Sequence, residues 1–308
     1  MVKYIINRLI LAVPVILGSL TLVFLIIHWL PGDPARMLAG DDHAEDRIQY
    51  LQEQLGLNRP LWVQYFTYLW DSMRGDFGHS FANQQPVMDR LLSQLPSTAE
   101  LAVVSTIFAI ITGITLGILS AVYRNRLVDY VIRIVSLFGV SMPKFWLGIL
   151  LILIFSVHLH LLPAIGNGSF KQVILPAFAL GVTGAGILAR MVRNSILEVI
   201  EDPFVTTLRA KGVTERKVLY LHVLRNALLP SLTIIGVIFV GMLEGAVVTE
   251  TVFARQGIGK MVVDAIGQKD IPVIQASILI CAVFNIVVNL LVDISYSFVD
   301  PRVRQQSA

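Results

Sequence analysis

Cysteine and charge are what this sequence has least of. Of its 308 residues only Cys281 is a cysteine, and it lies inside an apolar run. A disulfide within the chain is therefore excluded, and so is a metal site built on the usual cysteine–histidine spacings. Charged residues make up 15% of the chain, and the mean hydropathy is +0.72. These values exclude an ordinary soluble domain.

A phosphate-binding loop is also lacking. The sequence contains neither GxxxxGKS nor GxxxxGKT, and its nearest glycine-rich stretch, GVTGAG at 181–186, is not followed by lysine. We therefore expect this chain to bind no cofactor, to hydrolyse no ATP and not to be an enzyme. The small residues of 181–186 favour close packing between membrane helices instead.

Long apolar runs dominate what is present. A run of about 20 apolar residues is long enough to cross the hydrocarbon core of a membrane as a helix. Six runs qualify, at 9–30, 99–122, 132–160, 173–192, 228–250 and 273–298. The third is expected to break near Pro143, because proline removes a backbone hydrogen bond. The sequence thus predicts an all-α polytopic membrane protein with six transmembrane helices.

The basic residues predict how these helices are oriented. The N-terminus together with 123–133, 190–227 and 301–308 holds fourteen lysines and arginines against five acidic residues. Positive charge concentrates on the cytoplasmic side of membrane proteins, so both termini are expected in the cytoplasm. This pattern also accounts for the net charge of +3 without a nucleic-acid partner. Residues 31–98 then form a large external loop, whose aromatic residues favour short helices at the outer membrane surface.

The segment between the fourth and fifth runs has the pattern of two short helices. Asp202 is a candidate N-cap, and proline follows it in the first turn. Gly212 then provides a sharp bend, and Thr214 is a candidate cap for the second helix. A short helix held at the membrane face suits docking into a groove on a soluble partner. A solvated loop whose cations only fix topology is the alternative.

One ionisable residue lies well inside an apolar run. Glu244 falls within the fifth run, and charged groups inside a membrane are costly and often functional. It either lines a transport path, where it would meet a cationic group of the substrate, or pairs near the outer half of the membrane. Both interpretations remain open from the sequence.

Several stretches, in order, resemble one family. LRAKG at 208–212 and VLYLHVLRNALLP at 218–230 are similar to the cytoplasmic coupling loop in permease subunits of ATP-binding-cassette (ABC) importers. PGDPA at 31–35, RGDFGHSF at 74–81 and TETVFARQGIGK at 249–260 also resemble that family. The resemblance is to its dipeptide, oligopeptide and nickel branch, and the long external loop resembles the first permease of the pair. Leu208 stands where this family usually has alanine.

The resemblance implies a fold, a function and partners. It implies a type I ABC importer permease fold, with residues 1–98 as first helix and external loop and 99–304 as a five-helix core. The chain would form half of a path for di- or oligopeptides in the bacterial inner membrane. Its partners would be a second homologous permease, two ATPase subunits that bind ATP and magnesium, and an external solute-binding protein. Nickel or another small solute is an alternative cargo, and a stand-alone secondary transporter is a less favoured alternative.

The resemblance also assigns site residues. The coupling helix, at about 202–217, would transmit the motion of the ATPase subunits to the membrane helices. The residues that it implies for this role are Asp202, Phe204, Arg209, Ala210, Lys211 and Gly212. Glu244 is the candidate residue for the substrate path.

Overall fold

The computed structural model of the chain describes residues 2–29, 45–54 and 56–299. These residues form helices and connecting loops, and no strand occurs among them. The all-α prediction is therefore confirmed for the part of the chain that is described. The PGDPA stretch at 31–35 and the basic tail at 301–308 lie outside the described residues.

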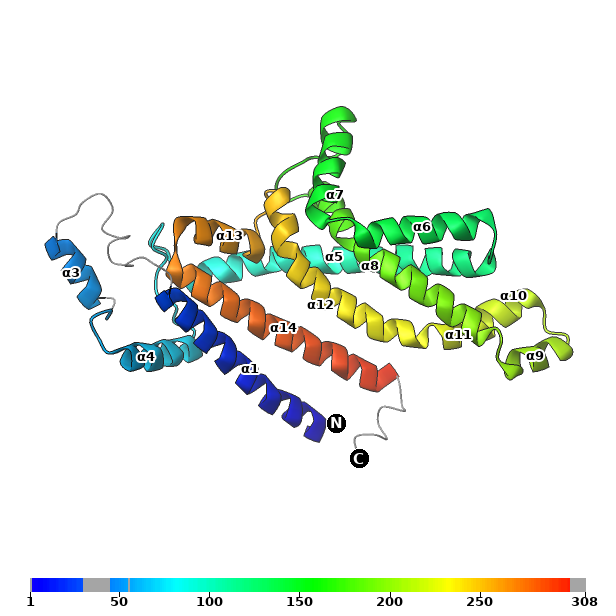
Figure 1. The fold of residues 1–308 in the computed structure, drawn as a ribbon, viewed down its shortest axis with the longest axis horizontal. Coiled ribbons are helices and arrows are strands. Elements are labelled where there is room, and N and C mark those ends of the chain that lie inside the picture. Colours follow the sequence, from blue (N-terminus) through cyan, green and yellow to red (C-terminus); the bar gives the residue numbers. More distant parts are fainter. Residues whose placement is uncertain (1, 30–44, 55, 300–308) are drawn as a thin grey trace. The chain divides into compact units, whose positions relative to one another are not determined.

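The helices follow the expected runs closely, with some additions (Figure 1). In chain order they are α1 (Val2–Trp29), α3 (Glu45–Gln54), α4 (Leu61–Arg74), α5 (Val87–Val122), α6 (Leu127–Ser141), α7 (Lys144–Leu151), the π-helix η1 (Ile152–His158), α8 (Phe170–Val199), α9 (Pro203–Ala210), α10 (Glu215–Lys217), the π-helix η2 (Val218–Val223), α11 (Leu224–Ala227), α12 (Leu229–Val252), α13 (Ile258–Gln268) and α14 (Ile271–Val299). The connection between the fifth and sixth runs contains a helix, α13, that the sequence pattern did not predict.

Fewer helices among the described residues qualify as candidate membrane spans than the six expected. Within the described residues, α5, α8, α12 and Ile271–Val292 of α14 are long and apolar enough to cross a membrane. The bent pair of α6 with α7 and η1 gives a fifth candidate. In α1 the apolar stretch Ile10–Ile26 is shorter than these spans. A count of four or five spans is thus supported, and six stays a prediction.

The expected break at Pro143 is present. Helix α6 ends at Ser141 and α7 begins at Lys144, and the two axes are bent by 107°. Proline cannot donate a backbone hydrogen bond, and its ring disfavours helical geometry in the residue before it. Met142 accordingly has extended backbone angles at the end of α6.

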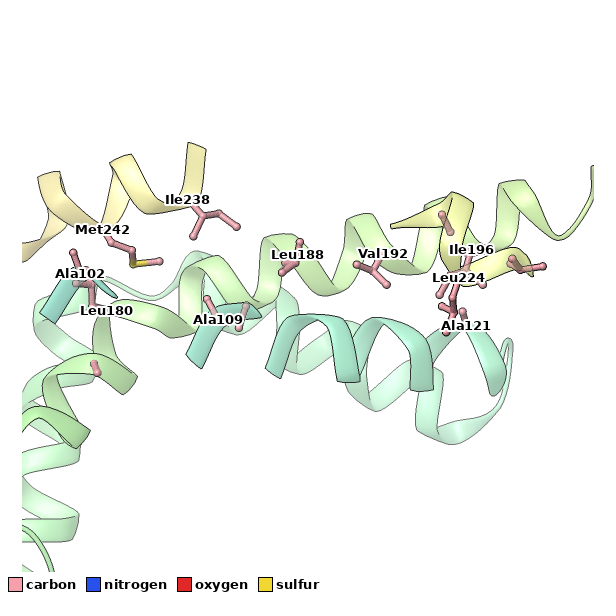
Figure 2. Packing of buried hydrophobic residues seen from close by; sticks show 14 of the residues in the cluster. Ala102, Ala109, Ala121, Leu180, Leu188, Val192, Ile196, Leu224, Ile238 and Met242 are labelled. Atoms are coloured by element: carbon pink, nitrogen blue, oxygen red, sulfur yellow. The ribbon is translucent and has the colours of Figure 1, made fainter. Parts of the chain in front are cut away.

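The chain divides into two compact units. One comprises residues 1–96 and 261–290, and the other comprises 97–260 and 291–308. In the second unit α8 is the central helix, since 67% of its most apolar stretch is buried, against 28% for α12. Figure 2 shows Leu188 and Val192 of α8 in the same cluster of buried residues as Ala109 of α5 and Ile238 of α12. The expected division between residues 98 and 99, into a first helix with its external loop and a five-helix core, stays a prediction.

Glycines on α8 allow its neighbours to approach closely. A Cβ at Gly184 would lie 2.7 Å from the methyl carbon of Met242 on α12. A Cβ at Gly186 would lie 2.6 Å from the carbonyl oxygen of Ser136 on α6. Real side chains do not tolerate such distances, so the GVTGAG stretch serves helix packing in this structure, as its composition predicts.

Adding one methyl group at Gly186 is expected to destabilise the protein. Gly186→Ala forces α8 and α6 apart, because the obstructing atom belongs to the backbone. We expect a loss of about 1–3 kcal/mol, as for other overpacked cores. The matched control is Gly241→Ala on α12, where a Cβ meets nothing within 4 Å. Thermal inactivation of the detergent-solubilised chain measures both, and equal midpoints would contradict the packing argument.

Candidate functional site

Helix α9 begins where the sequence predicts. Asp202 occupies the N-cap position with extended backbone angles, and Pro203 is the first helical residue. The Asp202 carbonyl accepts a hydrogen bond from the Val205 N–H at 3.0 Å. The side chain of Asp202, however, makes no capping hydrogen bond, and neither does that of Thr214 before α10. The predicted cap positions are therefore correct, but the predicted side-chain caps are not formed in this structure.

The glycine turn after α9 has the geometry expected of it. Gly212 has a φ of +76°, in the left-handed region. The Gly212 N–H donates to the Arg209 carbonyl at 2.9 Å, and the Val213 N–H donates to the Leu208 carbonyl at 3.1 Å. This pair of bonds is a Schellman motif, which ends a helix and reverses the chain through a residue with positive φ.

One face of α9 is anchored in the core of its unit. Val205 is fully buried there, and Leu208 and Val213 pack against the same cluster. Leucine at position 208, where the family usually has alanine, thus adds an apolar contact between α9 and the core. The other face consists of exposed residues, among them Phe204, Arg209, Ala210 and Lys211. The structure therefore holds the predicted residues on a short helix with an anchored side and a free side.

An ion pair spans the turn between α9 and α10. Arg209 donates to both carboxylate oxygens of Glu215, at 2.8 and 3.2 Å. These hydrogen bonds lower the pKa of the Glu215 carboxyl and raise that of the Arg209 guanidinium. Both side chains are exposed, so the pair adds little to stability. Its two hydrogen bonds connect the last turn of α9 to the start of α10.

A buried carboxylate, Asp129, contacts the C-terminal part of α8. Asp129 of α6 is fully buried and accepts two hydrogen bonds from Arg193 of α8, at 2.8 and 2.9 Å. Ser120 of α5 donates to it at 2.6 Å, and the Asn125 N–H donates at 2.9 Å. Three helices are thus joined through one carboxylate. The sequence identified Asp129 only as an acidic residue between basic ones.

A second buried carboxylate organises the start of α13. Glu250 of α12 is fully buried and accepts from Thr98 at 2.6 Å and from the Lys260 N–H at 3.1 Å. Thr98 in turn accepts from the Ile258 N–H at 2.9 Å. The carboxylate therefore satisfies N–H groups at a helix N-terminus, where negative charge is favourable. This role was not predicted from the sequence, although Glu250 lies in the stretch TETVFARQGIGK at 249–260.

The candidate path residue lies beside a lysine. Glu244 is exposed on α12 in the isolated chain, and the next residue is Gly245. The Lys144 ammonium lies so close to Gly245 that a Cβ there would clash with it, and Lys144 and Glu244 attract each other. Leu180 of α8 borders the same glycine, so Lys144 at the start of α7 lies where α8 and α12 meet.

Comparison with known proteins identifies the family. Residues 113–305 match the sequence profile of the binding-protein-dependent transport system inner membrane component. Residues 1–102 match the profile of the N-terminal part of such membrane components.

Full-length relatives and solved structures agree with these matches. The chain is 40% identical to the dipeptide transport system permease protein DppB of Alkalihalophilus pseudofirmus, covering 99% of this chain and 100% of that protein. It is equally similar to the glutathione transport system permease protein GsiC of Escherichia coli K12, covering 99% of each. An inward-facing structure of the MetNI methionine ABC transporter matches 69% of this chain and 97% of that one, with a TM-score of 0.58 and 20% identity, which shows a shared fold. This chain belongs to the inner membrane component family of binding-protein-dependent transport systems.

Proposed function

We propose that this chain is one of two membrane-spanning subunits of an ATP-driven importer of small peptides. The observation that carries the proposal is the α9 segment, which is anchored through Val205, ended by a left-handed Gly212 and exposed along its other face. A rigid projecting helix of this kind transfers the motion of a bound domain to a packed helix bundle. Peptide cargo is supported by the equal similarity to dipeptide and glutathione permeases.

The proposal includes the partners and the location of the chain. A second homologous permease would complete the path, and two ATPase subunits would supply ATP and magnesium, since the sequence has no phosphate loop. A solute-binding protein would deliver the cargo on the outer side. The chain would lie in the bacterial inner membrane with six spans, a type I importer fold and both termini in the cytoplasm, as the charge pattern favours.

Co-purification tests this proposal directly. The chain is tagged, extracted gently from its native membrane and analysed for associated proteins. We expect a second permease and ATPases with phosphate loops, and we expect reconstituted vesicles to take up dipeptide or glutathione only with ATP and a solute-binding protein. Competition between the two peptides then identifies the preferred cargo. A chain that is recovered alone and works with an ion gradient would instead be a secondary transporter.

We also propose that Glu244 contacts the substrate. Its exposure on α12 leaves the carboxylate available to a cationic group in the path. Glu244→Gln is expected to lower uptake about ten-fold without affecting assembly, because a charged hydrogen bond contributes roughly 1.5–3 kcal/mol. Uptake kinetics in proteoliposomes measure the effect.

Lys144 provides the control for Glu244. If the carboxylate serves only to balance the nearby ammonium, the double variant Glu244→Gln with Lys144→Gln should recover uptake. We expect the double variant to remain impaired, because the substrate contact is still missing. Recovery, or normal uptake by Glu244→Gln alone, would refute a role in the path.

A further inference from the structure

Helix α4 has three distinct faces. Its sequence, LWVQYFTYLWDSMR, places Trp62, Phe66, Trp70 and Met73 within about 80° of its circumference, at 100° per residue. Tyr65, Tyr68 and Ser72 lie on a second face. Thr67, Asp71 and Arg74 lie on a third. A helix on the surface of a soluble protein usually has one apolar face, which packs on the core. In α4 the first and second faces both carry large aromatic side chains, so each needs its own explanation.

The second face binds α1. The Tyr65 hydroxyl and the Thr21 hydroxyl are 2.7 Å apart, and both residues lie in the same compact unit. The Phe24 ring lies 5.2 Å from the Tyr65 ring and 5.9 Å from the Tyr68 ring. These contacts hold α4 against the C-terminal part of α1.

The first face is apolar and uncovered. Trp62, Phe66, Trp70 and Met73 are 67%, 62%, 56% and 67% exposed in the described structure. Such a stripe of large exposed apolar side chains marks a surface that lipid or another protein covers. Leu22, Leu25 and Ile26 of α1, the helix that α4 packs against, are exposed as well.

The third face is polar and borders the aromatic stripe. The Arg74 guanidinium carbon lies 4.5 Å from the centre of the Trp70 ring. Arginine beside tryptophan suits the headgroup region, where the ring is half-immersed and the cation reaches phosphate and water.

We propose that α4 lies in the plane of the membrane interface at the C-terminal end of α1, with Trp62, Phe66, Trp70 and Met73 among the lipid acyl chains. The helix has 14 residues and a length of about 21 Å, which is too short to cross a core of about 30 Å. Phospholipid is favoured over protein because α4 packs against α1, whose apolar stretch Ile10–Ile26 also exposes large apolar side chains. The proposal is independent of the cargo and of the ATPase subunits.

Tryptophan fluorescence tests the proposal in the full chain. The sequence has four tryptophans, so Trp29→Phe with Trp146→Phe leaves only Trp62 and Trp70. This variant is reconstituted in bilayers whose phospholipids carry bromine near the headgroup end or near the terminus of the acyl chains. We expect bromine near the headgroup end to reduce emission about two-fold or more, because interfacial helices lie roughly 5–10 Å into this boundary. Bromine at the chain terminus should quench less.

A probe on the polar face is the matched control. Thr67→Trp, in a chain whose four native tryptophans are phenylalanine, should be quenched by aqueous iodide and not by brominated lipid. Size-exclusion chromatography confirms that each variant remains folded. Strong iodide quenching of Trp62 and Trp70 without lipid quenching would overturn the proposal. Protection from iodide that appears only when a solute-binding protein is added would overturn it too, in favour of protein docking.

Discussion

Replacing Gly212 by valine is expected to abolish transport while leaving ATP hydrolysis in place. Gly212 has a φ of +76°, in the left-handed region. This backbone conformation costs an L-residue about 1–2 kcal/mol, and β-branched residues tolerate it least. The turn then opens, and the hydrogen bond from the Val213 N–H to the Leu208 carbonyl is lost. Helix α9 no longer keeps a fixed angle to the core, so motion of a bound ATPase is not transmitted.

The cause of this effect can be isolated, because Gly212 has no steric neighbour. A Cβ at this position meets nothing within 4 Å, so bulk alone has no effect. Gly212→Asn is the matched control, since asparagine tolerates the left-handed region, and it should keep most of the uptake. The assay compares ATP hydrolysis and peptide uptake in proteoliposomes of the whole transporter. Valine and asparagine variants that behave alike would refute a role for the positive φ.

The Gly212 turn was predictable because its chemistry is local. Proline after an N-cap position and glycine after a short helix are signals within a few residues of each other. The structure places α9 and the Gly212 turn where those signals stand. The break at Pro143 was predictable for the same reason, since proline acts on its own backbone and on the residue before it.

The buried carboxylates were not predictable from local pattern. Asp129 depends on Arg193, which is 64 residues away, and Glu250 depends on Thr98, which is 152 residues away. Neither spacing follows a helical period, so only the packed fold brings the partners together. The side-chain caps were predicted, but they are not formed. Asp202 and Thr214 stand at N-cap positions, but exposed side chains can bond to water instead.

The neighbours of Lys144 were not predictable either. Proline before a lysine indicates a helix start, but it does not indicate what that start packs against. In the structure α7 packs against α8 and α12, and the Lys144 ammonium lies beside Gly245 of α12. The sequence predicts the break itself, but the partners of α7 depend on the packed fold.

Removing the Asp129 carboxylate is expected to be the most destabilising change in the second unit. Asp129→Ala leaves Arg193, whose side chain is only 14% exposed, without its counter-ion. Breaking one partner of a buried ion pair costs about 3–5 kcal/mol, because the remaining charge is uncompensated. It also removes the acceptor for Ser120 of α5 and for the Asn125 N–H of the α5–α6 loop, so these contacts are lost together with the two from Arg193 of α8. Thermal inactivation in detergent measures the effect.

An exposed arginine–glutamate pair nearby is the matched control. Arg124 and Glu201 are joined at 3.1 Å, but their side chains are 50% and 68% exposed. Glu201→Gln should therefore change stability by no more than about 1 kcal/mol. The double variant Asp129→Leu with Arg193→Met should recover much of the stability lost in Asp129→Ala, because both charges are gone. If Asp129→Ala and the double variant lose stability equally, shape and not charge holds the three helices together. If Asp129→Ala is neutral, the carboxylate does not organise this end of α8.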